Sequence, residues 1–185
     1  GTTDNCLSHL GVFIESLAIT LNAGEIAQAS FSVAGIDYDT PTGVPVLNPQ
    51  GCTSTPFVVK KIIMKKDKAV LNAQNVSITI TNTLNDRTAV TSNGISDKVL
   101  TNKSIEISYS IDLEDLTAYT DLKNNTEAEL YIELVNGTEE DKIYIPVMSY
   151  TAVDKSDDAG VLSLSITANA YPDANGEAMY IATKK

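Results

Sequence analysis

The sequence has no tryptophan, three phenylalanines, one histidine (His9) and two cysteines (Cys6 and Cys52) in 185 residues. So few imidazoles and thiols exclude a zinc site of His and Cys ligands. The two cysteines either pair with each other, closing a long loop, or remain free thiols, and the sequence leaves both open. A Ser-His-Asp site would have to use His9, but no G-x-S-x-G nucleophile elbow accompanies it. We therefore predict no catalytic, metal or cofactor-binding residues and expect a non-enzymatic protein.

Long apolar runs are also missing. No window approaches 18 uninterrupted apolar residues, and the apolar N-terminal stretch has no basic start and contains Glu15. We therefore expect neither a membrane span nor a signal peptide.

Basic residues are scarce, with 13 Lys and Arg against 24 Asp and Glu, a net charge of −11. Five of the 13 lie in KKIIMKKDK, from Lys60 to Lys68. This segment has three interpretations: a nucleic-acid contact, a sheet edge protected by lysines, or a contact with an acidic surface of a second copy. It lacks the arginines and aromatic residues that bind phosphates and stack on bases. The second and third interpretations are therefore favoured.

Period-two alternation dominates the rest of the chain. One side of each segment is apolar and the other is hydroxyl-rich or charged, as in half-buried antiparallel strands. These segments are 76–80, 105–113, 130–134, 143–147 and 162–166. Residues 12–34 predict a hairpin with a turn at 22–25. Residues 35–57, with four prolines and three glycines, predict one extended loop.

One short helix is expected at about residues 113–123. Asp112 is available as N-cap, and Lys123 followed by Asn124 and Asn125 suits the C-terminal end. An apolar stripe recurs at three-residue spacing. It consists of Leu113, Leu116, Tyr119 and Leu122. The predicted fold is a mainly β, single domain over 1–185: an antiparallel β-sandwich or small barrel with one short α-helix packed on it.

The remaining polar motifs favour ordinary structure. The acidic segment 154–160 does not match the twelve-residue calcium loop and predicts a hairpin turn. Paired carboxylates of the glycosidase kind would need aromatic platforms that a chain without tryptophan lacks. The N-x-S/T triplets at Asn75, Asn124 and Asn136 are interpreted as chance matches.

Four segments together carry a resemblance to a known family. ESLAITLNAGEIAQASFSVAG resembles the opening hairpin of bacteriophage tail tube proteins, and VSITITNTLNDRTAV their next core strand. LTNKSIEISYSIDLEDLTAYTDLKNNTEAELYIELVNG is similar to their central strand, helix and following strand. KIYIPVMSYTAVDKSDDAGVLSLSITANAY is similar to the closing pair, so the resemblance spans about residues 12–181. The lysine segment 60–68 has no counterpart in this pattern.

The resemblance implies a structural virion protein of the phage tail, assembled in the host cytoplasm. Six copies would form a ring whose sheets join into an inner barrel, and stacked rings would conduct DNA without specific binding. Tape measure, terminator and distal tail proteins would be its partners, and no membrane is involved. The 35–57 loop would then make ring-to-ring contacts. Channel-facing strand positions would carry Asp, Glu, Ser and Thr more often than Lys, so lysines 60–68 should lie elsewhere.

Two alternatives stay open from the sequence. One is a non-catalytic β-sandwich binding module for a cell surface or carbohydrate, which the scarcity of aromatic residues disfavours. The other is a related ring protein, either a tail terminator or a secretion-tube subunit.

Overall fold

The computed structural model describes residues 8–22, 24–39, 61–88, 95–113, 116–136, 139–158 and 161–184. The chain divides into two compact units. Unit 1 comprises Gly1–Leu17, Phe31–Thr55 and Thr81–Lys103, and unit 2 comprises Ala18–Ser30, Pro56–Ile80 and Ser104–Lys185.

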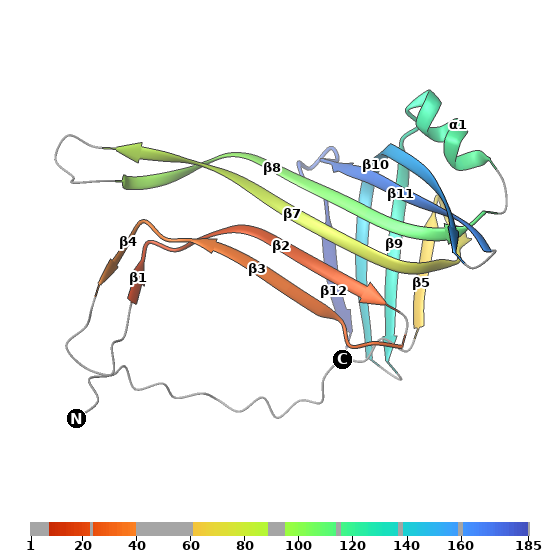
Figure 1. Ribbon diagram of the computed structural model, residues 1–185, viewed down its shortest axis with the longest axis horizontal. Coiled ribbons are helices and arrows are strands. Elements are labelled where there is room, and N and C mark those ends of the chain that lie inside the picture. The colour runs from red at the N-terminus through yellow and green to blue at the C-terminus, as the bar shows by residue number, and fades with distance from the viewer. Residues whose placement is uncertain are drawn as a thin grey trace. The chain divides into compact units, whose positions relative to one another are not determined.

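Antiparallel strands make up most of the described chain, with one helix (Figure 1). The elements are β1 (Ser8–Leu10), β2 (Phe13–Asn22), β3 (Gln28–Ala34), β4 (Asp37–Asp39), β5 (Lys61–Lys66), β6 (Ala69–Leu71), β7 (Ala73–Thr88), β8 (Ile95–Asp112), α1 (Thr117–Asn124), β9 (Ala128–Asn136), β10 (Glu139–Asp158), β11 (Val161–Tyr171) and β12 (Tyr180–Lys184). Ten strands form one open sheet in the order β3-β2-β7-β8-β11-β10-β9-β5-β6, and β12 pairs with β10. The predicted hairpin at 12–34 is confirmed as β2 and β3.

In unit 2 the 20-residue strand β10 belongs to two parts of the sheet. Its first part pairs with β9 and β12, and its second part, from Val147, pairs with β11. The ladder to β9 is irregular between Ile145 and Met148, where Pro146 has no N–H to donate. A second irregularity lies between Tyr150 and Ala152. Such bulges bend a strand, which allows β10 to continue from one part of the sheet into the other.

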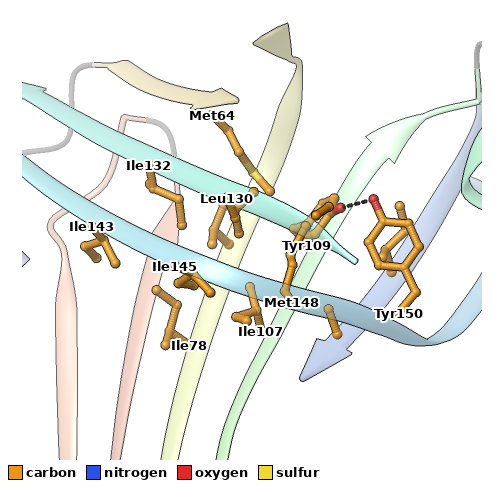
Figure 2. Packing of buried hydrophobic residues seen from close by; sticks show 14 of the residues in the cluster. Met64, Ile78, Ile107, Tyr109, Leu130, Ile132, Ile143, Ile145, Met148 and Tyr150 are labelled. Carbon is orange, nitrogen blue, oxygen red and sulfur yellow. Dashed lines mark hydrogen bonds between the residues drawn. The ribbon is translucent and has the colours of Figure 1, made fainter. Parts of the chain in front are cut away.

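Both parts of the sheet in unit 2 contribute to one apolar core (Figure 2). Val76, Ile78, Ile107 and Leu164 come from β7, β8 and β11, while Met64, Leu130, Ile132 and Ile145 come from β5, β9 and β10. The alternating side chains of each strand place the apolar residues in this core and the polar residues outside. The mainly β, sandwich-like fold predicted from the sequence is confirmed.

Two tyrosines in the core, Tyr109 and Tyr150, satisfy each other's buried hydroxyl groups. The hydroxyls of Tyr109 and Tyr150 lie 2.8 Å apart, and their rings meet edge to face at 6.5 Å and 65°. Burial raises the pKa of both phenols. Each hydroxyl is therefore neutral at physiological pH and has the partner that a buried polar group requires.

The helix begins later than the sequence predicts. Asp112 is the last residue of β8 rather than an N-cap, and its Oδ1 accepts a hydrogen bond of 2.8 Å from Gln74. Leu113 N–H donates to Leu162 O at 2.9 Å, so strand pairing continues past Asp112. Helix α1 starts at Thr117, after Leu116, which supplies no side-chain cap. Tertiary pairing with β11 thus overrides the local helix signal.

The end of α1 agrees with the prediction. Lys123 lies in the last turn, and Asn125 adopts a left-handed conformation with φ 49°. The N–H groups of Asn125 and Thr126 donate to Leu122 O and Asp121 O. These bonds satisfy carbonyls that the helix end would otherwise leave unpaired.

In unit 1 the predicted 35–57 loop is partly ordered as a strand. β4 pairs with β1 in a separate two-stranded sheet, with His9 opposite Tyr38. Gly11 precedes β2 with φ +59°, and an added Cβ would lie 2.8 Å from the Ile36 side chain. Only glycine fits this close, left-handed position without strain. Residues 40–60 lie outside the described residues.

Truncating a core side chain should show where the stability resides. We expect Ile132→Ala, at a fully buried position, to lower the free energy of unfolding by about 2–5 kcal/mol. The matched control Ile26→Ala, at an exposed position, should change it by less than about 0.5 kcal/mol. Urea unfolding followed by circular dichroism measures both, and equal losses would contradict the assignment of the core.

Candidate assembly edges and polar sheet face

One face of the sheet in unit 2, on the side away from the core, is lined by hydroxyl groups. The ladder between β8 and β11 pairs Ser110 with Ser165, Ser108 with Thr167, and Glu106 with Asn169. We call this surface the polar face. It consists of Ser77, Thr79, Ser104, Glu106, Ser108, Ser110, Asp112, Asp154, Ser156, Ser163, Ser165, Thr167 and Asn169. It holds three carboxylates and no lysine or arginine, so it offers no fixed cation to a phosphate.

Strand β3 is an unprotected edge. Among the described residues it ends the strand order and pairs only with β2. Its sequence, QASFSVA, contains no charge and no proline, the residues that commonly protect sheet edges. Phe31 and Val33 are 60% and 58% exposed and point to the same side of the strand. An exposed apolar edge of this kind is a template for pairing with another chain.

Strand β8 provides a second edge. Its ladder with β11 covers only Ile105 to Asp112, although the strand begins at Ile95. Within the described pairings, residues 95–104 therefore have no partner on the β11 side. Leu100 is among the exposed large apolar side chains of this stretch. Both β3 and this part of β8 leave backbone hydrogen-bonding groups available.

Lys65 and Lys66 do not protect an edge. β5 pairs with β9 on one side and residues 64–66 pair with β6 on the other, so the edge-protection interpretation is wrong for these two lysines. Lys61 pairs with Val135 of β9, and the described ladder with β6 does not reach it. Asp67 and Lys68 form the two-residue turn to β6, with φ 48° and 72°. Positive φ at both residues is the geometry of a tight hairpin. Lys60 lies outside the described residues.

Neighbouring lysines of β5 point to opposite sides of the sheet. Lys65 lies over the Tyr131 ring, 5.8 Å from its centroid. Lys66 lies 5.1 Å from the Tyr150 centroid and forms an ion pair with Asp121 of α1. Burial alone would lower the pKa of Lys66, but the hydrogen bond to Asp121 and nearby negative charge outweigh it, so this pKa is raised. Lys66 thus ties the β5–β6 hairpin to the helix instead of contributing to a basic patch.

The other residues that the sequence singles out are not brought together. Cys6 and Cys52 lie outside the described residues, so their pairing stays a prediction. His9 is on β1, while Asp154 lies within β10, which extends to Asp158. Among the described residues, no three His, Cys, Asp or Glu side chains are grouped to hold a metal ion. No helix in this part of the chain is long and apolar enough to cross a membrane.

These features define a class of protein: an open antiparallel sheet with strand edges available for association and a hydroxyl-rich face without lysine or arginine. The chain belongs to the phage tail tube protein family, because the model for that family, described as "Phage tail tube protein", matches residues 1–177. The resemblance noted in the sequence is thereby confirmed. The chain is a structural component of a phage tail. A comparison with curated proteins finds no match.

The sequence indicated the polar face but not the edges. Alternation alone placed serines and threonines away from the core. Which strands end the sheet depends on strand order, and nothing in the alternation gives that order. The uncharged pattern of QASFSVA was the one available signal, because edge strands without a partner usually carry a charge or proline.

Removing the Lys66 charge should destabilise the fold through its partner. In Lys66→Met, Asp121 keeps a largely buried carboxylate with no cation, and we expect a loss of about 1–3 kcal/mol. The double variant Lys66→Met/Asp121→Leu removes both charges and should recover most of this loss. Urea unfolding of wild type, Lys66→Met, Asp121→Leu and the double variant at pH 7 gives the coupling energy. Equal losses in the single and double variants would contradict the coupling.

The same pair predicts a pH dependence. The folded state raises the pKa of Lys66 above its ordinary value of 10.5. Its stabilising contribution is therefore fully present below pH 10.5 and is lost as the pH rises through the folded-state pKa. The difference in unfolding free energy between wild type and Lys66→Met should stay constant from pH 7 to 10 and shrink above pH 10.5. A difference that grows with pH would contradict this sign.

Proposed function

We propose that this chain is the tail tube subunit whose copies form hexameric rings, and that stacked rings make the channel through which phage DNA passes. The observation that carries the proposal is that two strand edges have no described partner: the outer side of β3 and the β11 side of residues 95–104 of β8. An edge of one copy that pairs with a different edge of the next makes a head-to-tail contact, which closes into a ring when the rotation permits.

The polar face supports the channel. DNA carries one negative charge per phosphate, and a wall with fixed lysines would hold it by releasing counterions. The polar face presents hydroxyl and amide groups together with three carboxylates, Glu106, Asp112 and Asp154, and no cation. We propose that this face lines the channel, so that the duplex slides past without specific binding.

The partners of this assembly follow from the same proposal. The 1–185 subunit joins other copies of itself and the tape measure, terminator and distal tail proteins, and assembly takes place in the host cytoplasm. No catalytic residue, metal or cofactor has a role. The 35–57 loop, which lies mostly outside the described residues, contacts the neighbouring ring.

Electron microscopy tests the assembly directly. Purified protein at high concentration should form rings about 10 nm across, the scale for six compact subunits of this size, and stacked tubes. The edge variant Phe31→Lys/Val33→Lys should abolish rings, because charges on an edge strand oppose pairing. Leu116→Lys, at an exposed position outside the strands, should leave rings intact. Wild-type protein that stays monomeric at high concentration would contradict the proposal, and single unstacked rings would indicate a terminator.

The polar face gives a second test. In tubes carrying Ser108→Lys, Ser165→Lys and Thr167→Lys, we expect double-stranded DNA to be retained, because each lysine neutralises phosphates and releases counterions. The matched control Asn124→Lys, Thr126→Lys and Asn175→Lys adds the same charge outside this face. Filter retention of labelled DNA should rise only for the first set and should fall steeply with added salt. Equal retention by the two sets would contradict a channel lined by the polar face.

A further inference from the structure

Five strands of unit 2 form a continuous run, β12-β10-β9-β5-β6, with two free ends. On the core side, one cross-strand row follows the register from β12 to β6. It consists of Ile181, Ile143, Ile132, Met64 and Leu71. Its central members are buried, while Ile181 at one end is 59% exposed. An apolar row that is buried in the middle and open at its end lacks a neighbour there.

The adjacent row on the opposite side has the same property. It consists of Tyr180, Tyr144, Tyr131, Lys65 and Val70. Tyr180 at the β12 end is 37% exposed, and Val70 at the β6 end is 64% exposed. Each free strand thus presents one apolar side chain on each side of the sheet, in neighbouring rows.

The two ends match in direction as well as in register. Every pairing in this run is antiparallel, so β6 and β12, four strands apart, run in the same direction. A second copy placed beside β6 by rotation about a ring axis would bring its β12 alongside in parallel. Residues 70 and 71 then meet residues 180 and 181 in the same order. A slip by one residue would put each side chain on the wrong side of the sheet.

Space for the incoming strand exists at the β6 end. A cavity of about 350 Å³ lies beside β6, against α1 and the end of β8, and includes Val70, Leu71 and Ala118 in its lining. A second cavity of about 450 Å³ shares Val70 and Leu71 and adds Ile62 and Ala73. Both linings also include polar and charged side chains, among them Asn72 and Asp112. A strand that adds to the sheet here would meet the aliphatic side chains of β6 beside polar partners.

We propose that β12 of one copy pairs in parallel with β6 of a second copy, so that Tyr180 lies beside Val70 and Ile181 lies beside Leu71. The occupant is a second copy because this chain carries both halves of the contact, the edge of β12 and the edge of β6 with a cavity beside it, in matching register. The contact is head-to-tail. It is a second contact between neighbouring copies, in addition to the one proposed between β3 and β8. It rests on the proposed self-assembly of the chain.

Cysteine cross-linking tests the register. In a Cys6→Ser/Cys52→Ser background, Val70→Cys/Tyr180→Cys should oxidise to a ladder of covalent oligomers that reductant removes. Neighbouring strands are about 4.8 Å apart, within disulfide reach. The matched control Val70→Cys/Ala182→Cys moves one thiol two residues along the same face and should give no ladder. A mixture of the two single variants, Val70→Cys and Tyr180→Cys, should stop at dimers, because each copy then has only one thiol to cross-link.

Electron microscopy of the same background separates this proposal from the ring. Rings or tubes without a Val70–Tyr180 ladder, or with an equal ladder in the Ala182 control, overturn the β12–β6 contact and leave the ring proposal intact. A ladder without rings supports the contact and counts against hexameric closure. Absence of both overturns both.

A variant without cysteines provides an independent readout. Ile181→Lys places a charge beside Leu71 in the proposed contact and should weaken assembly, measured by sedimentation, at least about tenfold. Ile26→Lys, an exposed isoleucine outside both rows, should change it little. Circular dichroism shows whether each variant folds. Equal assembly of the two folded variants would overturn the proposal.

Discussion

The backbone of an open sheet has to find hydrogen-bond partners at its edges, and this constraint governs the whole structure. Inside the chain, long strands satisfy most of these groups: β10 alone serves β9, β11 and β12. At β3, β6, β12 and the first part of β8, no described strand completes the pairing. Buried edges without partners are costly, and exposed ones attract other chains. A sheet with edge strands such as β3 and β6, which carry no charge, is therefore better suited to an assembly than to a solitary monomer.

The fold class and most strands were predictable because alternation is a local property. Val76, Ile78 and Ile107 occupy the core, as their spacing indicated. The helix was predicted with the wrong start, because Asp112 pairs with Gln74 and remains in β8. No local pattern could reveal that β11 extends the strand past a helix-capping residue. Likewise, β12 lies in a segment whose alternation is too short to distinguish it from a loop.

The candidate site, too, was only partly predictable from the sequence. The hydroxyl residues of the polar face were visible in the sequence, since Ser108 and Ser110 alternate with buried neighbours. The places where the lysine side chains lie could not be predicted from the sequence. Lys65 and Lys66 are adjacent in sequence, yet one stacks on Tyr131 and the other pairs with Asp121. Strand geometry sends neighbours to opposite sides, so a run of charges in a strand is never a single patch.

The net charge of −11 therefore does not tell how much charge lies on the face that would meet DNA. Most residues of the polar face are neutral. In a ring, every charge on this face would be repeated in each copy around a narrow channel. A wall dense in carboxylates would repel itself as well as the duplex, and self-repulsion destabilises the compact assembly. Hydroxyl groups avoid both problems, because they bind water and carry no charge to accumulate. In the proposed ring, three carboxylates per copy, Glu106, Asp112 and Asp154, would keep the charge of this face negative. Lys65 and Lys66 of β5 meanwhile contact Tyr131, Tyr150 and Asp121. The distribution of charge between faces, more than its sum, is what allows a protein to surround DNA without holding it.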